Sequence, residues 1–266
     1  MSLVKQNALN LIHHGNWVFD LILPTFKTEL ESQTGSTGLN RSISQLTLAA
    51  YLQMMQIKST QFPEAISISD FADGDMAQRL ASHVYSKGVA ADFTALEQEA
   101  IEQTCTMFLK TKPDLFQLVQ RIFSGFFRVQ GGTFSGASYP HAYGFYFTGD
   151  KFFSISTAER CLSLVHELAH QELFLLNLVD RLVEKAADHQ LRFASFQGKA
   201  RPPIGRLHSL AAIFRMLQFS AYFSGNQEFL KTKFKETRLS FEKGELTEFG
   251  ELLVSNMENY LGALSA

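Results

Sequence analysis

The longest uninterrupted helical pattern constrains the fold of this chain most, because no glycine or proline occurs between Ser156 and Gly198. The run Ser156-Thr-Ala-Glu159 has the spacing of a capping box, in which two side chains satisfy backbone amides at the start of a helix. Beyond it, one apolar stripe recurs at helical spacing, formed by Leu162, Val165, Ala169, Leu173, Leu176 and Val183. The pattern predicts a single helix over residues 156–192.

The same stretch contains an HExxH motif, His166-Glu167-Leu168-Ala169-His170. Side chains four residues apart lie on one face of a helix, about 6 Å apart at Cβ, so two imidazoles can reach one metal ion. Chance alone produces such a string in about one chain in a hundred of this length. The motif predicts a metal site at His166 and His170 with Glu167 as a catalytic residue. The alternative is a pair of histidines that only pack on the helix.

Composition excludes several classes of protein. The chain has 266 residues, of which 45% are hydrophobic, enough for one compact domain over 1–266. A formal net charge of -2 gives no basic stripe, so nucleic acid is not an expected partner. The first residues lack a signal-peptide pattern, and no run approaches about 18 apolar residues. We therefore expect a cytoplasmic protein without a membrane partner.

The remaining pattern predicts an α+β fold that is mostly α-helical. Residues 1–125 form an expected N-terminal helical part, and 126–266 form the part with the metal site. Aromatic residues predict three short strands, with a hairpin turn at 148–150 between the last two; the strands are 127–130, 143–147 and 151–155. We expect a small antiparallel sheet packed on the HExxH helix, in zincin-like surroundings. The polar loop from Phe134 to His141 either lines a pocket or is an ordinary surface loop.

The third metal ligand is not supplied by the familiar peptidase patterns. The metzincin extension requires a glycine and a histidine where this chain has Leu173 and Leu176. Glu184 has the residue type of a thermolysin-like ligand, but it follows His170 by fourteen residues in the same predicted helix. At 1.5 Å per residue it would be roughly 20 Å away along the axis.

His208 is the next candidate ligand along the chain. It falls in a second predicted helix, over 203–223, which is favoured to begin after Arg201-Pro-Pro203 because proline is tolerated in a first turn. A site with three histidines leaves coordination positions open. Such a site can hold zinc for hydrolysis or ferrous iron for oxygen chemistry, and the residues alone do not choose between them.

Two motifs taken together resemble a known family. Leu164-Val-His-Glu-Leu-Ala-His170, followed after a loop by Arg201-Pro-Pro-Ile-Gly-Arg-Leu-His208, is similar to the HExxH motif domain proteins of peptide natural-product clusters. Their pattern combines HExxH with RPxxGxLH, and the similarity covers about residues 135–223. Members of this family are understood as iron- and α-ketoglutarate-dependent β-hydroxylases of ribosomally made precursor peptides, often encoded beside, or fused to, radical SAM enzymes.

The resemblance implies roles for individual residues. His166, His170 and His208 would hold Fe(II), and Glu167 would position water or substrate. Arg201 would bind the distal carboxylate of α-ketoglutarate, for which a bidentate guanidinium is well suited. Arg206 is a second candidate for binding the cosubstrate. The implied partners are a precursor peptide, with or without a leader segment, and a companion radical SAM enzyme.

Three functions remain open. The first is an Fe(II)- and α-ketoglutarate-dependent oxygenase that uses O2 to hydroxylate a side-chain carbon, most simply Cβ, of a peptide. The second is a zinc metallopeptidase with Glu167 as the general base for a metal-bound water. The third is a non-catalytic scaffold that binds peptides and retains the fold of a metalloenzyme.

Overall fold

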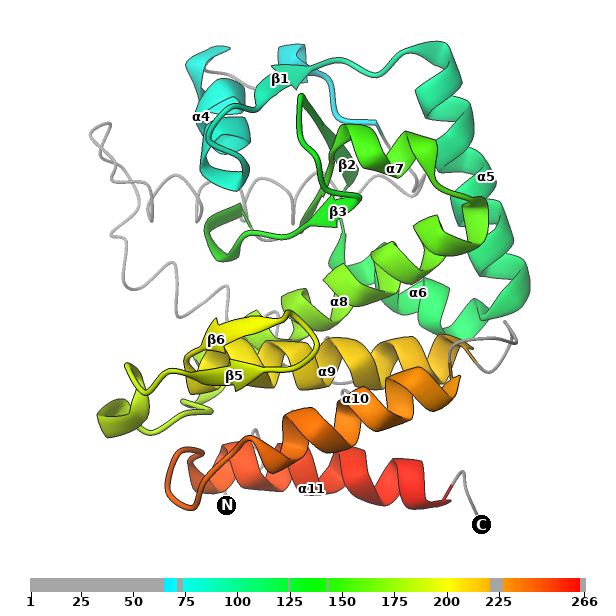
Figure 1. The fold of residues 1–266 in the computed structure, drawn as a ribbon. Helices are drawn as coiled ribbons and strands as arrows, with labels where there is room; N and C mark the ends of the chain where they lie inside the picture. The colour runs from blue at the N-terminus through cyan, green and yellow to red at the C-terminus, as the bar shows by residue number, and fades with distance from the viewer. Residues whose placement is uncertain (1–64, 71–73, 124, 143, 221–226, 264–266) are drawn as a thin grey trace. The chain divides into compact units, whose positions relative to one another are not determined.

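The computed structural model describes residues 65–70, 74–123, 125–142, 144–220 and 227–263 (Figure 1). Residues 1–64, which include half of the expected N-terminal helical part, lie outside the described residues. Two compact units divide the chain between Gln171 and Glu172, inside one helix. The expectation of one domain with an N-terminal part over 1–125 and a metal-site part over 126–266 stays a prediction.

The first unit, over residues 65–171, combines helices with a small sheet (Figure 1). Its helices are α4 (Gly74–Val84), α5 (Ala95–Thr111), α6 (Pro113–Ile122), α7 (Asp150–Ser154) and the first part of α8 (Thr157–Val179), and two 3₁₀ turns cover Ile68–Asp70 and Pro140–Ala142. Its strands are β1 (Val89–Ala91), β2 (Gly125–Gln130), β3 (Gly136–Ala137) and β4 (Phe145–Thr148). The helix start predicted by a capping box is present at Ser156 for α8, and Thr94 forms a second capping box at the start of α5.

The four-stranded sheet is mixed, with the order β1-β2-β4-β3. Strands β2 and β4 are parallel, whereas β1 and β3 are each antiparallel to their neighbours. The prediction of an antiparallel sheet was therefore wrong. The helical character of the fold and the presence of a small sheet are confirmed, since helices make up most of the described elements.

The expected hairpin between residues 143 and 155 is replaced by a strand and a helix. Residues 151–155 were predicted to form a strand, but α7 occupies this segment because Asp150 at its first turn is held by contacts from other elements. Asp150 Oδ1 accepts a hydrogen bond of 2.6 Å from Arg128, and its Oδ2 accepts one of 3.0 Å from the amide of Gly131. These contacts fix the turn, and they override the strand preference of the two phenylalanines that follow.

The core of the first unit is aromatic. Phe126, Phe127, Tyr146, Phe147 and Phe152 are all completely or almost completely buried. Neighbouring rings meet edge to face, as Phe126 and Tyr146 do with centroids 5.1 Å apart. The hydroxyl of Tyr146 on β4 donates a hydrogen bond of 2.8 Å to Ser163 on α8, so this strand lies against the helix that carries the HExxH motif.

Helix α8 ends at Val179 and not near residue 192. Two polar side chains capture the amides that follow: Asp180 Oδ1 accepts from Arg181, and Asn177 Oδ1 accepts from Leu182. Such local side-chain bonds compete with a continuing helix. The chain then forms an isolated bridge between Val183 and Leu246, a distant contact that the helical pattern does not reveal.

The second unit, over residues 172–263, is mainly helical beyond the end of α8. A 3₁₀ turn, Lys185–Ala187, precedes a hairpin of β5 (Arg192–Ala194) and β6 (Lys199–Arg201), and the helices α9 (Pro203–Ser220), α10 (Gln227–Leu239) and α11 (Glu248–Ala263) follow. The predicted helix over 203–223 is confirmed from Pro203 to Ser220, and residues 221–223 lie outside the described residues. In the described part of the chain, no helix has both the length and the apolar character needed to cross a bilayer.

Candidate metal centre

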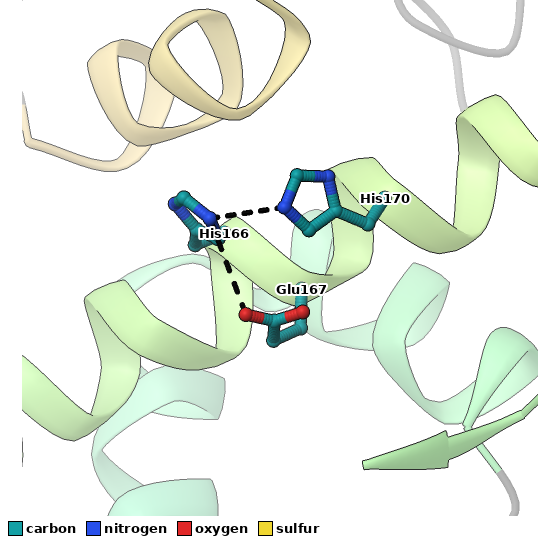
Figure 2. A group of neighbouring side chains, drawn as sticks. All are labelled: His166, Glu167 and His170. Carbon is teal, nitrogen blue, oxygen red and sulfur yellow. Dashed lines mark hydrogen bonds and ion pairs between the residues drawn. The ribbon is translucent and has the colours of Figure 1, made fainter. Parts of the chain in front are cut away.

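The two motif histidines form a pair on one face of α8 (Figure 2). His166 Nε2 and His170 Nε2 are 3.0 Å apart, and the two rings are perpendicular to each other. Two nitrogens that each lie about 2.1 Å from one ion, at a right angle, are about 3 Å apart. Both side chains are half-buried, so an ion between them would be partly shielded while remaining accessible. The pair is therefore arranged as two ligands of one ion.

Glu167 completes a cluster whose ligand atoms all lie within 4.8 Å of one another. Its Oε1 is 4.0 Å from His166 Nε2, and its side chain is only 7% exposed (Figure 2). Burial raises the pKa of Glu167 above its usual value, although His166 and hydrogen bonding from Ser138 act in the opposite direction. A carboxyl group of raised pKa beside a metal site holds a proton more readily than an exposed carboxyl group does.

Ser138 is the polar partner of this carboxylate, and sequence reasoning did not single it out. Its hydroxyl donates a hydrogen bond of 2.5 Å to Glu167 Oε2. Ser138 belongs to the loop from Phe134 to His141, which was considered for lining a pocket because it is polar and interrupted by glycine. The polar, glycine-interrupted composition of this loop is the sequence feature that points to it, but it does not indicate which serine reaches α8.

The segment before Ser138 is anchored on the same helix. Ser163 on α8 donates a hydrogen bond of 3.1 Å to Ser135 and accepts one from Tyr146. Gly136 lies so close to this pair that a Cβ atom on it would be 2.3 Å from the hydroxyl oxygen of Tyr146 and 2.6 Å from that of Ser163. Only glycine allows the backbone of β3 to approach α8 this closely.

Gln171 ties the following turn of α8 to the start of β4. Its Oε1 accepts a hydrogen bond of 3.1 Å from the amide of Gly144, and the side chain is completely buried. Its Nε2 is buried without a hydrogen-bond partner among the described residues. Because Gln171 directly follows His170, this bond fixes the helix at the position of the second histidine.

His208 lies on α9 in the second unit, where its ring is 5.0 Å from the ring of Phe174 on α8. Its assignment as third ligand stays a prediction. The argument that excluded Glu184 does not hold, because α8 ends before that residue and the helical distance of roughly 20 Å does not apply. Glu184 is exposed, and its amide donates a hydrogen bond to the carbonyl of Glu245.

The two candidate arginines of the second unit have different surroundings. Arg201 ends β6 and is half-buried, and its Nε is buried without a hydrogen-bond partner in the described parts of the chain. Arg206 is completely buried, with Nη2 2.8 Å from Glu245 Oε1 and its guanidinium carbon 4.8 Å from the ring centre of Phe241. These contacts favour a structural role for Arg206 over the expected role in binding a cosubstrate.

No protein-family model matches the chain, and no curated protein matches it.

Proposed function

We propose that this protein is an Fe(II)- and α-ketoglutarate-dependent oxygenase that hydroxylates a side-chain carbon, Cβ, of a ribosomally made precursor peptide. His166 and His170 would hold the iron, with His208 as the third ligand. The observation that carries the proposal is the Nε2–Nε2 separation of 3.0 Å on a capped helix, together with a buried carboxylate beside it. A site built from imidazole ligands suits ferrous iron, and it leaves positions open for a cosubstrate.

The residues around the pair fit this chemistry. When bound, iron and α-ketoglutarate supply the oxidation of a C–H bond by O2, which yields the alcohol, succinate and CO2. Ser138 holds Glu167 on one oxygen, so the other oxygen of Glu167 is left to orient water or substrate. Tyr146 on β4, which is completely buried and bonds to Ser163, covers this side of α8 and keeps water from it.

Two observations in the second unit support the remaining assignments. His208 on α9 packs against Phe174 of α8, the helix that carries the HExxH motif. Arg201 has a buried Nε without a partner among the described residues, as expected of a guanidinium that binds an anion absent from the structure. The distal carboxylate of α-ketoglutarate is an anion of suitable geometry for it.

The experiment measures succinate. Purified protein is incubated with Fe(II), ascorbate, α-ketoglutarate and a precursor peptide encoded next to its gene. The proposal predicts succinate formation that requires iron and peptide, and a mass increase of one oxygen atom on the peptide. It is wrong if neither iron nor α-ketoglutarate binds while zinc supports cleavage of the peptide.

A zinc peptidase is the second candidate, and the pKa of Glu167 favours it. Burial raises this pKa, as the general base for a metal-bound water requires. In that case Glu167→Gln abolishes peptide cleavage. In the oxygenase, Glu167→Gln retains the binding of iron and α-ketoglutarate, because this residue is not a proposed ligand of either. Measuring peptide cleavage and the binding of iron and α-ketoglutarate on the same variant separates the two functions.

A further inference from the structure

The two edge strands of the four-stranded sheet differ in the hydrogen bonds that their outer backbone groups form. At the β1 edge, the amide of Ala90 donates a hydrogen bond of 3.1 Å to Gln78 Oε1 on α4. Gln78 Nε2 in turn donates one of 3.0 Å to the carbonyl of Gly88. One side chain therefore caps the backbone groups of this edge. Such protection is common, because an exposed strand edge is a template for pairing with another chain.

Among the residues that the structure describes, none caps the β3 edge in this way. Gly136 and Ala137 pair with Thr148 and Phe147 of β4 on one side. On the other side, none of the residues that the structure describes forms a hydrogen bond with the backbone of β3. The residues from Gly136 to Ser138 are half-buried, so this segment is partly accessible to solvent.

Side-chain contacts on both sides of this short strand hold it in place. Before it, Ser135 accepts a hydrogen bond from Ser163 on α8. After it, Ser138 binds Glu167, and the ring of Tyr139 is 5.7 Å from that of His83 on α4. An edge that is already fixed loses little conformational freedom when a partner binds, which favours affinity.

We propose that the free edge of β3 is the docking site of the peptide substrate, which binds there as an added, extended strand. The proposal rests on the proposed function for the identity of the substrate. An extended peptide suits a free edge, because its backbone N–H and C=O groups can pair with the unpaired C=O and N–H groups of the edge strand. The edge is also continuous with the metal centre, since Ser138 follows β3 directly and contacts Glu167 of the HExxH motif.

Strand addition also determines how the peptide is recognised. Successive side chains of a strand point to opposite faces, so alternate residues of the peptide face the same way as the side chain to be modified. Main-chain pairing supplies affinity independent of sequence, and specificity comes from those alternate side chains. Backbone amides of the peptide likewise alternate between pointing at β3 and pointing away from it.

A scan of backbone N-methylation tests this alternation. The probe is a dodecapeptide selected from a random library against protein loaded with Fe(II) and α-ketoglutarate under anaerobic conditions, and in parallel against metal-free protein. It is resynthesised with one N-methyl group at each position in turn. Methylation is expected to weaken binding about tenfold at every second position across the docked segment, with little effect between. Equal effects at neighbouring positions, or failure to select any peptide, would overturn the proposal.

Hydrogen exchange provides a second readout with an internal control. The dodecapeptide should slow amide exchange within residues 136–138 and leave Val89–Ala91 at the capped edge unchanged. Slower exchange of 136–138 that depends on protein concentration in the absence of peptide would assign the edge to a second copy of this chain and contradict peptide docking.

Binding of iron and of α-ketoglutarate is measured separately, without peptide. If iron and α-ketoglutarate both bind but the N-methylation effects do not alternate, the docking proposal is wrong and the oxygenase proposal is not affected. If neither binds but the effects alternate with metal-free protein, the oxygenase proposal is wrong and the docking proposal is not affected.

Discussion

At the scale of residues, the metal centre depends on a few side chains whose positions have separate causes. The spacing of His166 and His170 in one helix places both rings on one face, and the sequence predicts this directly. The partner of Glu167 comes from a different segment, because Ser138 reaches it from the end of a two-residue strand. The spacing of residues along the chain predicts which side chains share a face of one helix or strand, but not which other element they contact. Contacts between elements therefore had to be learned from the structure.

Replacement of Ser138 tests whether the orientation of Glu167 matters for function. Ser138→Ala removes the hydrogen bond to Glu167 Oε2, so turnover should fall about tenfold while iron affinity changes little, as for other residues that orient a site indirectly. Steady-state kinetics and metal titration measure the two effects. Ser135→Ala is the matched control. Ser135 lies in the same loop as Ser138, but it bonds to Ser163 on α8 and not to Glu167. Equal loss of turnover in both variants would show that Ser138 acts only through loop stability.

At the scale of elements, β3 and α8 are held together by a close backbone approach. Gly136→Ala places a Cβ 2.3 Å from the hydroxyl oxygen of Tyr146, so the strand must move away from the helix. We expect destabilisation of about 1–3 kcal/mol and lower turnover, since Ser138 moves with the strand. Chemical denaturation and succinate release measure these effects.

Gly262→Ala is the control for this substitution. No atom lies within 4 Å of a Cβ at Gly262, which belongs to α11. Alanine there should stabilise the protein by up to about 1 kcal/mol, because glycine is the poorer helix former. If Gly136→Ala were as stable and as active as the Gly262 variant, the close approach of β3 to α8 would not be needed for function.

The ion pair of Arg206 and Glu245 joins α9 to the segment before α11. Removing one partner leaves a buried charge unpaired, so Glu245→Gln should cost about 3–5 kcal/mol in unfolding free energy near neutral pH. Lys231→Ala, in an exposed pair with Glu228, should cost less than about 1 kcal/mol. Urea denaturation of both variants measures the difference. Equal costs would contradict the structural role of Arg206.

The pH dependence of this pair follows from the pKa of Glu245. Burial opposes its ionisation, but hydrogen bonds from Arg206 and the amide of Glu242, with the charges of Arg206 and Arg192, lower the pKa below its usual value. Its contribution to stability is therefore present above the unfolded pKa of about 4.3 and is lost as pH falls through the lower folded pKa. The stabilities of wild type and Glu245→Gln should converge in that acidic range. A constant difference down to the lowest pH would contradict this assignment.

Helix starts were easier to predict than helix ends. The capping boxes at Thr94 and Ser156 are local signals, and each is present in the structure. The end of α8 depends on a bridge between Val183 and Leu246, and α7 depends on contacts to Asp150. Those partners are distant in sequence, so the local pattern predicted a longer helix and an extra strand.

At the scale of the whole molecule, the proposed ligands come from two helices that are far apart in sequence. His166 and His170 belong to α8, and His208 belongs to α9. His208→Ala should therefore reduce iron affinity by an amount similar to His170→Ala. His189→Ala is the control, because His189 is an exposed histidine of the same unit as His208. Metal titration of the three variants measures this, and unchanged affinity in His208→Ala would remove it from the ligand set.

Anaerobic binding of Fe(II) and α-ketoglutarate tests the central claim most directly. A cosubstrate bound to ferrous iron through its keto acid produces a visible charge-transfer absorption, which is titrated in the wild type and in His170→Ala. We expect an absorption that saturates at one iron per chain, disappears in His170→Ala and weakens in Arg201→Ala. Absence of this absorption in the wild type, in a protein that binds zinc and cleaves peptides, would contradict it.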